Sequence, residues 1–131
     1  MVALTRDERL RRRERITKKR EFSRVLEEGS RIPGELFTLF LLPNDLGYHR
    51  FGVIVGRKVG KIAKRNLAKR RLKEAFRRNK PKGNLTFDIV AIGKQPILEV
   101  KTPRVEEEFR RKLTYFLRSL GMDGPLWEES S

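Results

Sequence analysis

The sequence has no cysteine and a single histidine, His49, and both facts remove classes of chemistry. Without cysteine there is no disulfide, zinc ribbon, cysteine-ligated cluster or thiol nucleophile, and this composition suits a reducing compartment, so we expect a cytoplasmic protein. His49 lies in a short polar stretch between two apolar segments, and no serine or threonine is spaced to form a triad with it. We therefore interpret His49 as a solvated loop histidine.

Long apolar runs and phosphate loops are also missing. The longest apolar run, Leu36–Leu42, is too short to span a bilayer, and Met1–Leu10 lacks the apolar core of a signal peptide. Gly52, Gly56 and Gly60 are too widely spaced for a phosphate loop, and the acids are scattered. We expect no membrane association, no bound metal and no catalytic residue in this chain.

Basic charge is abundant and concentrated. The chain has a net charge of +15, and residues 57–80 hold twelve Lys or Arg but one acid, Glu74. A basic helix face is usually a solvated surface whose charges are balanced by acids four residues away. Glu74 alone cannot balance twelve basic residues. Uncompensated charge of this density predicts a polyanionic partner, most simply a nucleic acid.

The apolar pattern predicts one α+β domain in which helices pack on a small mixed sheet, in the order α-β-β-α-β-α. Residues 1–17 are expected to form a flexible basic arm, residues 18–121 the domain, and residues 122–131 a loose tail. The predicted helices are 18–28, 61–79 and 105–120, the predicted strands are 36–42, 50–57 and 86–92, and a further short strand is possible at 31–33. The short link 43–49 suggests that the first two long strands form an antiparallel hairpin.

Local signals refine two of these helices. In the basic helix, Ala68, Leu72, Ala75 and Phe76 form an apolar stripe, and a contiguous arc beside it holds Asn66, Lys69, Arg70, Lys73 and Arg77. In the last helix, Thr102 suits the N-cap and Pro103 the first turn, while Glu106–Glu108 match the helix dipole. Gly121 is expected to end that helix.

The nature of the nucleic acid is harder to predict. The basic helix follows a strand through a Lys58-Val59-Gly60 turn, whereas a helix-turn-helix needs a packed helix there, so DNA is not the expected partner. RNA recognition often adds aromatic stacking, which Phe22 and Phe40 could supply. Spacing alone leaves these two rings open between core and binding surface, and slightly favours the core.

Residues 50–78, RFGVIVGRKVGKIAKRNLAKRRLKEAFRR, resemble the protein subunit of bacterial ribonuclease P. That family shows a Val/Ile-rich strand, a basic Lys-x-Gly turn and a helix with an Arg-Asn-Arg signature. Lys19-Arg20-Glu21-Phe22 upstream and Phe87-Asp88-Ile89-Val90 downstream extend the similarity. Arg65 and Asn66 match the signature, but its third position is Leu67, so Arg70 and Arg71 would have to compensate or the contact is weaker.

The resemblance implies a fold, a function and a set of site residues. The fold is an α+β sandwich like the second domain of ribosomal protein S5, with an unusual left-handed crossover. The function is to assist RNA-catalysed, magnesium-dependent removal of the 5′ leader from precursor tRNA, so ribonuclease P RNA and precursor tRNA are the implied partners. The leader would lie in a cleft beside Phe22 and Phe40. The implied RNA contacts are Arg57, Lys58, Lys61, Lys64, Arg65, Asn66, Lys69, Arg70, Lys73 and Arg77. The competing hypothesis is a ribosomal or RNA-chaperone protein without a processing role.

Overall fold

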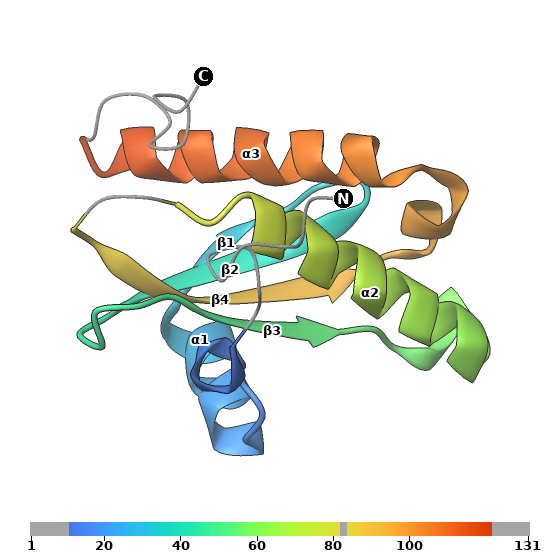
Figure 1. Cartoon of the computed structure of the whole chain (residues 1–131), viewed down its shortest axis with the longest axis horizontal. Coiled ribbons are helices and arrows are strands. Elements are labelled where there is room, and N and C mark those ends of the chain that lie inside the picture. The colour runs from blue at the N-terminus through green and yellow to red at the C-terminus, as the bar shows by residue number, and fades with distance from the viewer. Residues whose placement is uncertain (1–10, 82–83, 122–131) are drawn as a thin grey trace, which may run out of the picture.

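The computed structural model describes residues 11–81 and 84–121, and within them four strands form one sheet with helices on both faces (Figure 1). The helices are α1 (Lys19–Glu28), α2 (Ile62–Arg78) and α3 (Thr102–Ser119), and the strands are β1 (Ser30–Ile32), β2 (Phe37–Asn44), β3 (Arg50–Ile54) and β4 (Thr86–Gly93). Short 3₁₀ turns occupy η2 (Arg12–Glu14), η3 (Arg57–Val59) and η4 (Gln95–Glu99). The predicted α+β class and element order are confirmed, and the extra short strand is β1.

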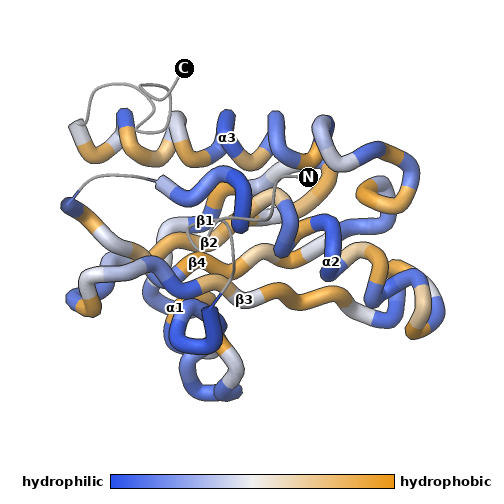
Figure 2. Tube along the Cα trace, viewed as in Figure 1, coloured by the Kyte–Doolittle hydropathy of each residue, from blue (hydrophilic) through white to orange (hydrophobic). Residues whose placement is uncertain are grey.

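Two apolar cores of unequal size hold the layers together. The larger core joins one face of the sheet to α2 and α3, and includes the stacked rings of Phe51 and Phe76, whose centroids are 4.4 Å apart. The smaller core joins the other face to α1 around Val25, Phe40 and Val90. Figure 2 shows the apolar residues concentrated on the strands and on the sides of α2 and α3 that face them. The cores therefore leave the outer face of α2 to charged residues.

The predicted hairpin between the first two long strands is wrong. The strand order is β1-β2-β4-β3, so β4 lies between β2 and β3, antiparallel to β2 and parallel to β3. The link from β2 to β3 passes the start of β4, where His49 Nδ1 accepts a hydrogen bond from the Phe87 N–H at 3.0 Å. A short link fits a hairpin, but it also fits a step across one intervening strand, and only non-local pairing decides between them.

The start of α3 also differs from its prediction. The helix begins at Thr102, and its N-cap is Lys101 rather than Thr102. Its first turn contains no acidic residue, so Glu106–Glu108 do not sit at the dipole end as expected. Glu108 is instead buried, 3% exposed, where it accepts a hydrogen bond from the Leu36 N–H and pairs with Lys112. Gly121 ends the helix as predicted, in the left-handed region at φ 83°.

The packed part of the chain begins before the predicted boundary at Lys18. Ile16 is 4% exposed within the smaller core, and its N–H donates to the Phe51 carbonyl at 2.9 Å. Arg15 and Phe51 form a parallel bridge, so this segment extends the sheet edge beside β3. Within the basic arm expected at residues 1–17, Glu14 and Ile16 are therefore buried against the domain, while their neighbours are exposed. Residues 1–10 and 122–131 lie outside the described residues.

Candidate RNA-binding surface

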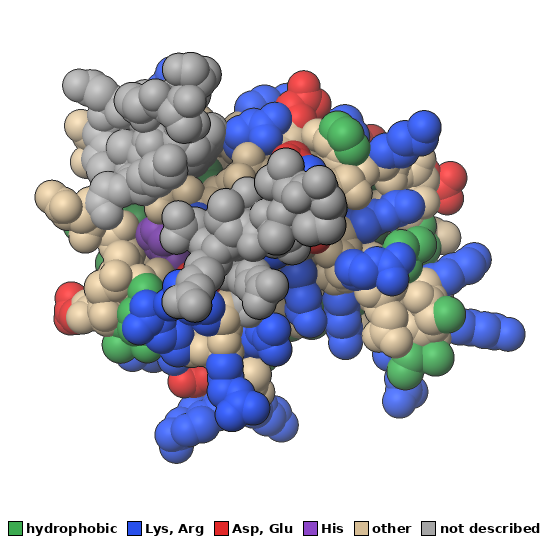
Figure 3. All heavy atoms as spheres, viewed as in Figure 1, with side chains coloured by type: hydrophobic (Ala, Val, Ile, Leu, Met, Phe, Trp, Pro, Cys, Tyr) green, Lys and Arg blue, Asp and Glu red, His purple; other side chains and the backbone are tan. Residues whose placement is uncertain are grey.

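The basic helix is fixed to the molecule by its apolar stripe. Ala68, Leu72, Ala75 and Phe76 are all at most 1% exposed, as the periodicity predicts. The turn before the helix includes Gly60 at φ 150°, a conformation that glycine adopts more readily than other residues. Because the stripe is buried against the sheet and α3, the opposite side of α2 is held rigidly toward solvent. Figure 3 shows Lys and Arg side chains gathered along α2.

The ten residues implied as RNA contacts divide into two groups. One group lies in η3, at the N-cap of α2 and in its first turn, comprising Arg57, Lys58, Lys61, Lys64 and Arg65. The other group lines a single hollow of about 390 Å³ beside α2, comprising Asn66, Lys69, Arg70, Lys73 and Arg77. The second group is the arc predicted from the helical wheel, so its members do meet in space. Figure 3 shows no comparable gathering of acidic side chains on this face.

Arg65 has an unusual environment. Its Nε is buried and has no hydrogen-bond partner among the described residues. A buried guanidinium N–H without a partner is costly, so Arg65 is held here at the expense of one hydrogen bond.

Glu74 lowers the charge of the hollow at one end. Its carboxylate accepts hydrogen bonds from Arg77 at 2.5 and 3.3 Å and pairs with Arg78 at 3.2 Å. The bond from Arg77 places the pKa of Glu74 below its ordinary value of 4.5, against the opposing effect of burial. Glu74 therefore stays ionised at neutral pH and orients two arginines of the helix.

Leu67 and Arg71 face away from the arc. Leu67 is half-buried and lines a separate hollow with Arg70, Arg71 and Thr102. The Arg71 guanidinium donates to the carbonyls of Ile97, at 2.8 Å, and Val100, which fixes η4 to α2. Arg71 is thus engaged in holding the fold, and Arg70, which is exposed, is the neighbour better placed to compensate for the missing signature arginine.

A second candidate surface lies on the α1 side of the sheet. Phe40 is 8% exposed within the smaller core, and Phe22 is half-buried at its edge. Ile54 and Ile92 are also half-buried on this face. From the structure, Phe40 is a supporting core ring, and Phe22 is the more accessible of the two predicted cleft residues.

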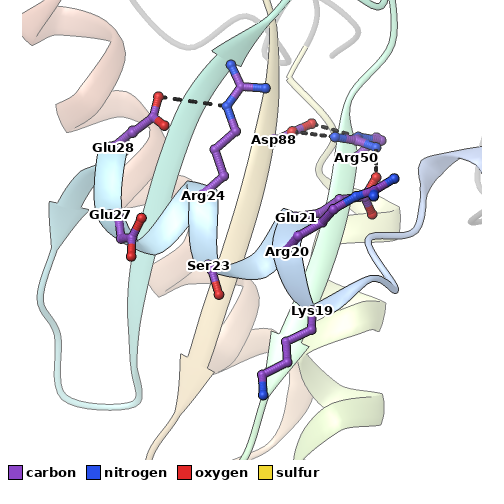
Figure 4. Close-up of a pocket in the computed structure, with 9 residues that line it drawn as sticks. All are labelled: Lys19, Arg20, Glu21, Ser23, Arg24, Glu27, Glu28, Arg50 and Asp88. Carbon is purple, nitrogen blue, oxygen red and sulfur yellow. Dashed lines mark hydrogen bonds and ion pairs between the residues drawn. The ribbon is translucent and has the colours of Figure 1, made fainter.

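An open groove of about 860 Å³ runs beside α1 and ends at a network of charged side chains (Figure 4). Arg50 pairs with Asp88 at 2.6 Å and with Glu21 of α1 at 2.8 Å. Lys19 and Arg24 come from α1 and line the same groove. Arg50 and Asp88 meet because β3 and β4 are neighbours in the sheet, with these two residues opposite one another.

His49 is buried, so its interpretation as a solvated loop residue is wrong. The residue is 8% exposed, and its Nδ1 accepts from the Phe87 N–H, which places the proton on Nε2. Nε2 then donates to the Pro81 carbonyl at 2.8 Å. His49 is a structural connector between the β2–β3 link and the chain around β4.

The described residues offer neither a cluster of metal ligands nor a membrane-spanning helix. No group of three or more His, Cys, Asp or Glu residues there could hold a metal ion. None of the helices in that part of the chain combines the length and apolar character that crossing a membrane requires. The groups that the structure does bring together are basic side chains on α2 and a mixed-charge groove beside α1.

The family model for ribonuclease P matches residues 10–116. The chain belongs to the ribonuclease P protein family. The ribonuclease P protein component of Thermotoga maritima is 41% identical over 103 residues, covering 76% of this chain and 79% of that protein. The corresponding protein of Syntrophus aciditrophicus is 36% identical over 105 residues, covering 80% and 88%.

Solved structures of the family agree with the fold. The ribonuclease P protein of Thermotoga maritima is similar at a TM-score of 0.64 and 36% identity, covering 85% of this chain and 99% of that one. The Staphylococcus aureus protein has a TM-score of 0.69 at 27% identity, covering 78% and 94%. As a ribonuclease P protein subunit, the chain is part of an endoribonuclease complex, takes part in tRNA 5′ processing and has the ribonuclease P RNA as its partner.

Proposed function

We propose that this subunit binds the ribonuclease P RNA through α2 and the 5′ leader of precursor tRNA along α1, while the RNA performs the cleavage. The observation that carries the proposal is the basic arc of α2, which is held outward by a buried stripe and opposed by one acid, Glu74. Phosphate contacts from such a face give affinity that falls steeply with salt. A cytoplasmic location belongs to the same proposal.

The physical role of the protein is to bring two polyanions together. Catalytic RNA and precursor tRNA repel one another, and a chain of net charge +15 between them screens that repulsion. Magnesium belongs in this proposal to the RNA-catalysed reaction. On the protein, the groove beside α1 offers Lys19, Arg20 and Arg24 to leader phosphates, with Phe22 nearby for a base. Phe40 supports that surface from within the core.

A reconstitution assay tests the cofactor role. Cleavage of precursor tRNA at low magnesium and moderate salt is compared for a bacterial ribonuclease P RNA alone, the protein alone and the mixture. Cleavage at the mature 5′ end in the mixture alone is the expected result. Cleavage by the protein alone would place catalysis in this chain, and no stimulation despite tight RNA binding would leave a general RNA-binding protein.

A leader series tests the α1 surface separately. Affinity of the reconstituted enzyme is measured for precursor tRNAs with full, shortened and absent leaders. A preference for the longer leader that is reduced by Phe22→Ala is expected. Arg111→Ala on α3, which removes an exposed charge far along the chain from α1, serves as the control and should keep the preference. Equal affinity for all leaders would rule out the assignment of the groove.

A further inference from the structure

The N-terminal segment is anchored beside α2 by contacts on either side of Arg15. Glu14, 9% exposed, accepts from the Arg11 N–H at 2.8 Å and from Lys80 Nζ at 3.0 Å. Ile16 is buried in the smaller core and donates its N–H to Phe51. These anchors connect the segment both to the residues after α2 and to the edge of the sheet. The backbone of Arg15 is therefore fixed by its two neighbours.

Arg15 lines the hollow that the arc of α2 forms. The hollow is thus walled by two separate parts of the chain, the N-terminal segment and the helix. It holds five basic side chains, from Arg15, Lys69, Arg70, Lys73 and Arg77, against the single acid Glu74. Because Glu74 is already paired with Arg77 and Arg78, it neutralises little of the charge of Lys69 and Lys73.

This arrangement has the chemistry of a phosphate site. Like charges gathered in one hollow repel one another, and an anion between them removes that cost. Arg15 and Arg70 supply guanidinium forks, Lys69 and Lys73 supply point charges, and Asn66 adds a neutral amide donor. The hollow is wider than a phosphate group, which suits a phosphodiester with its flanking sugars.

We propose that this hollow binds a backbone phosphate of RNA between Arg15 and α2, and that Glu14 is a positioning residue that holds Arg15 there. The proposal rests on the proposed function and adds to it a second wall that the resemblance to the family did not supply. The phosphate could come from the ribonuclease P RNA or from precursor tRNA, so both are tested.

Arg15→Ala is compared with Arg12→Ala, a matched control that removes the same charge from an exposed residue of the same segment outside the hollow. Affinity is measured for the ribonuclease P RNA alone, and then for precursor tRNA on the assembled enzyme, across a salt series. Arg15→Ala should weaken one of these interactions about tenfold and reduce its salt slope by about one, while Arg12→Ala changes affinity less than twofold. Whichever RNA is affected is the source of the phosphate. Equal effects of the two variants would overturn the site.

A double-mutant cycle tests whether the two walls act on one ligand. If Arg15 and Lys73 hold the same phosphate, the loss of RNA-binding free energy in the double variant Arg15→Ala, Lys73→Ala should differ clearly from the sum of the two single losses. Additive losses indicate separate contacts and contradict the proposal. Glu14→Gln should weaken RNA binding in the wild type but have no further effect in Arg15→Ala. A further loss in that background would show that Glu14 does not act through Arg15.

Two controls keep the outcomes separable. Circular dichroism and thermal melts confirm that each variant is folded before its RNA affinity is compared, and Arg15→Lys, which keeps the charge, should recover part of the binding. If the wild-type protein fails to bind the RNA, the proposed function is wrong. If the wild type binds and Arg15→Ala matches Arg12→Ala, only the hollow assignment is wrong.

Discussion

Asp88 of β4 accepts two hydrogen bonds from the guanidinium of Arg50 on β3, at 2.9 Å from Nε and 2.6 Å from Nη2. The remaining arm of Arg50 donates to Glu21 of α1 at 2.8 Å, and Asn44 of β2 donates to Asp88 at 2.7 Å. One carboxylate and one guanidinium therefore join three strands and a helix. Since α1 forms a wall of the groove, this network also determines the shape of the candidate leader surface.

Removing the charge of Asp88 should destabilise the fold. Asp88→Asn keeps the side-chain volume but replaces one of the two carboxylates paired with Arg50 by a neutral amide, while Glu21 stays paired with it. A charged hydrogen bond of this kind contributes about 2 kcal/mol. Urea unfolding at pH 7 measures the loss. Asp45→Asn, on the exposed β2–β3 link, is the matched control and should change stability by less than about 0.5 kcal/mol. Equal stability of both variants would show that the Arg50–Asp88 pair contributes little to the fold.

The same pair should make stability depend on acidic pH. Burial acts to raise the pKa of Asp88, but hydrogen bonds from Arg50 and Asn44 outweigh it and place the pKa below the ordinary 3.8. A folded-state pKa below the unfolded value gives stability that is present above pH 4 and lost as pH falls through the folded value. Asp88→Asn should therefore show a shallower loss of unfolding free energy below pH 4 than the wild type. An unchanged acid slope would contradict this assignment.

What could be predicted from the sequence was what depends on neighbours along the chain. The stripe Ala68–Phe76 and the arc containing Lys69 and Lys73 follow from a helical period of 3.6, and both were found. The pairing of Arg50 with Asp88 could not be derived, because it requires knowing that β4 lies next to β3. The insertion of β4 between two consecutive strands leaves no local signal.

The packing of the N-terminal segment against the sheet could not be predicted, for a related reason. Ile16 is a single apolar residue in a basic run, which periodicity cannot distinguish from noise, yet its burial fixes Arg15 and Glu14. The available signal was that Ile16 precedes, by a few residues, Phe22 and Val25 of α1, which pack in the same core. That Arg15 lines the hollow could not be predicted, because the hollow is formed by two distant parts of the chain.

His49 should make stability fall between pH 7 and 5. Burial lowers its pKa below the ordinary 6.5, against opposing contributions from the Pro81 carbonyl and Glu14, with Lys80 adding to the lowering. Protonation would place a hydrogen on Nδ1, which then could no longer accept the hydrogen bond from the Phe87 N–H. The unfolded chain then binds the proton more readily, so the folded state loses stability as pH falls through 6.5.

The test is simple because the chain has one histidine. His49→Gln should lower stability at pH 7 by about 1–3 kcal/mol, through imperfect replacement of two buried hydrogen bonds, and should flatten the dependence between pH 7 and 5. Unfolding by urea at several pH values measures both. A slope that persists in the variant would have to come from other groups.

Gly52 should be essential for seating α1. A Cβ on Gly52 would lie 2.5 Å from Phe22 Cε1 and 3.0 Å from Ile16 Cβ, so Gly52→Ala displaces the Phe22 ring from its place against the sheet. We expect a loss of about 1–3 kcal/mol and a reduced preference for long leaders. Gly56→Ala is the control, because a Cβ there meets nothing within 4 Å. If both variants retain the leader preference, Phe22 is not part of the leader surface.

Leu67→Arg should strengthen RNA binding without altering the fold. Leu67 is half-buried beside exposed Arg70, so a long charged side chain can extend to solvent from this position. Glu74 lines the same hollow and offsets part of the added repulsion. One further phosphate contact should raise affinity for the ribonuclease P RNA several-fold at moderate salt and steepen the salt slope by about one. Leu67→Gln, which changes polarity without charge, should leave the slope unchanged. If Leu67→Arg also leaves it unchanged, this side of α2 faces away from the RNA, and binding is confined to the arc and the first turn of the helix.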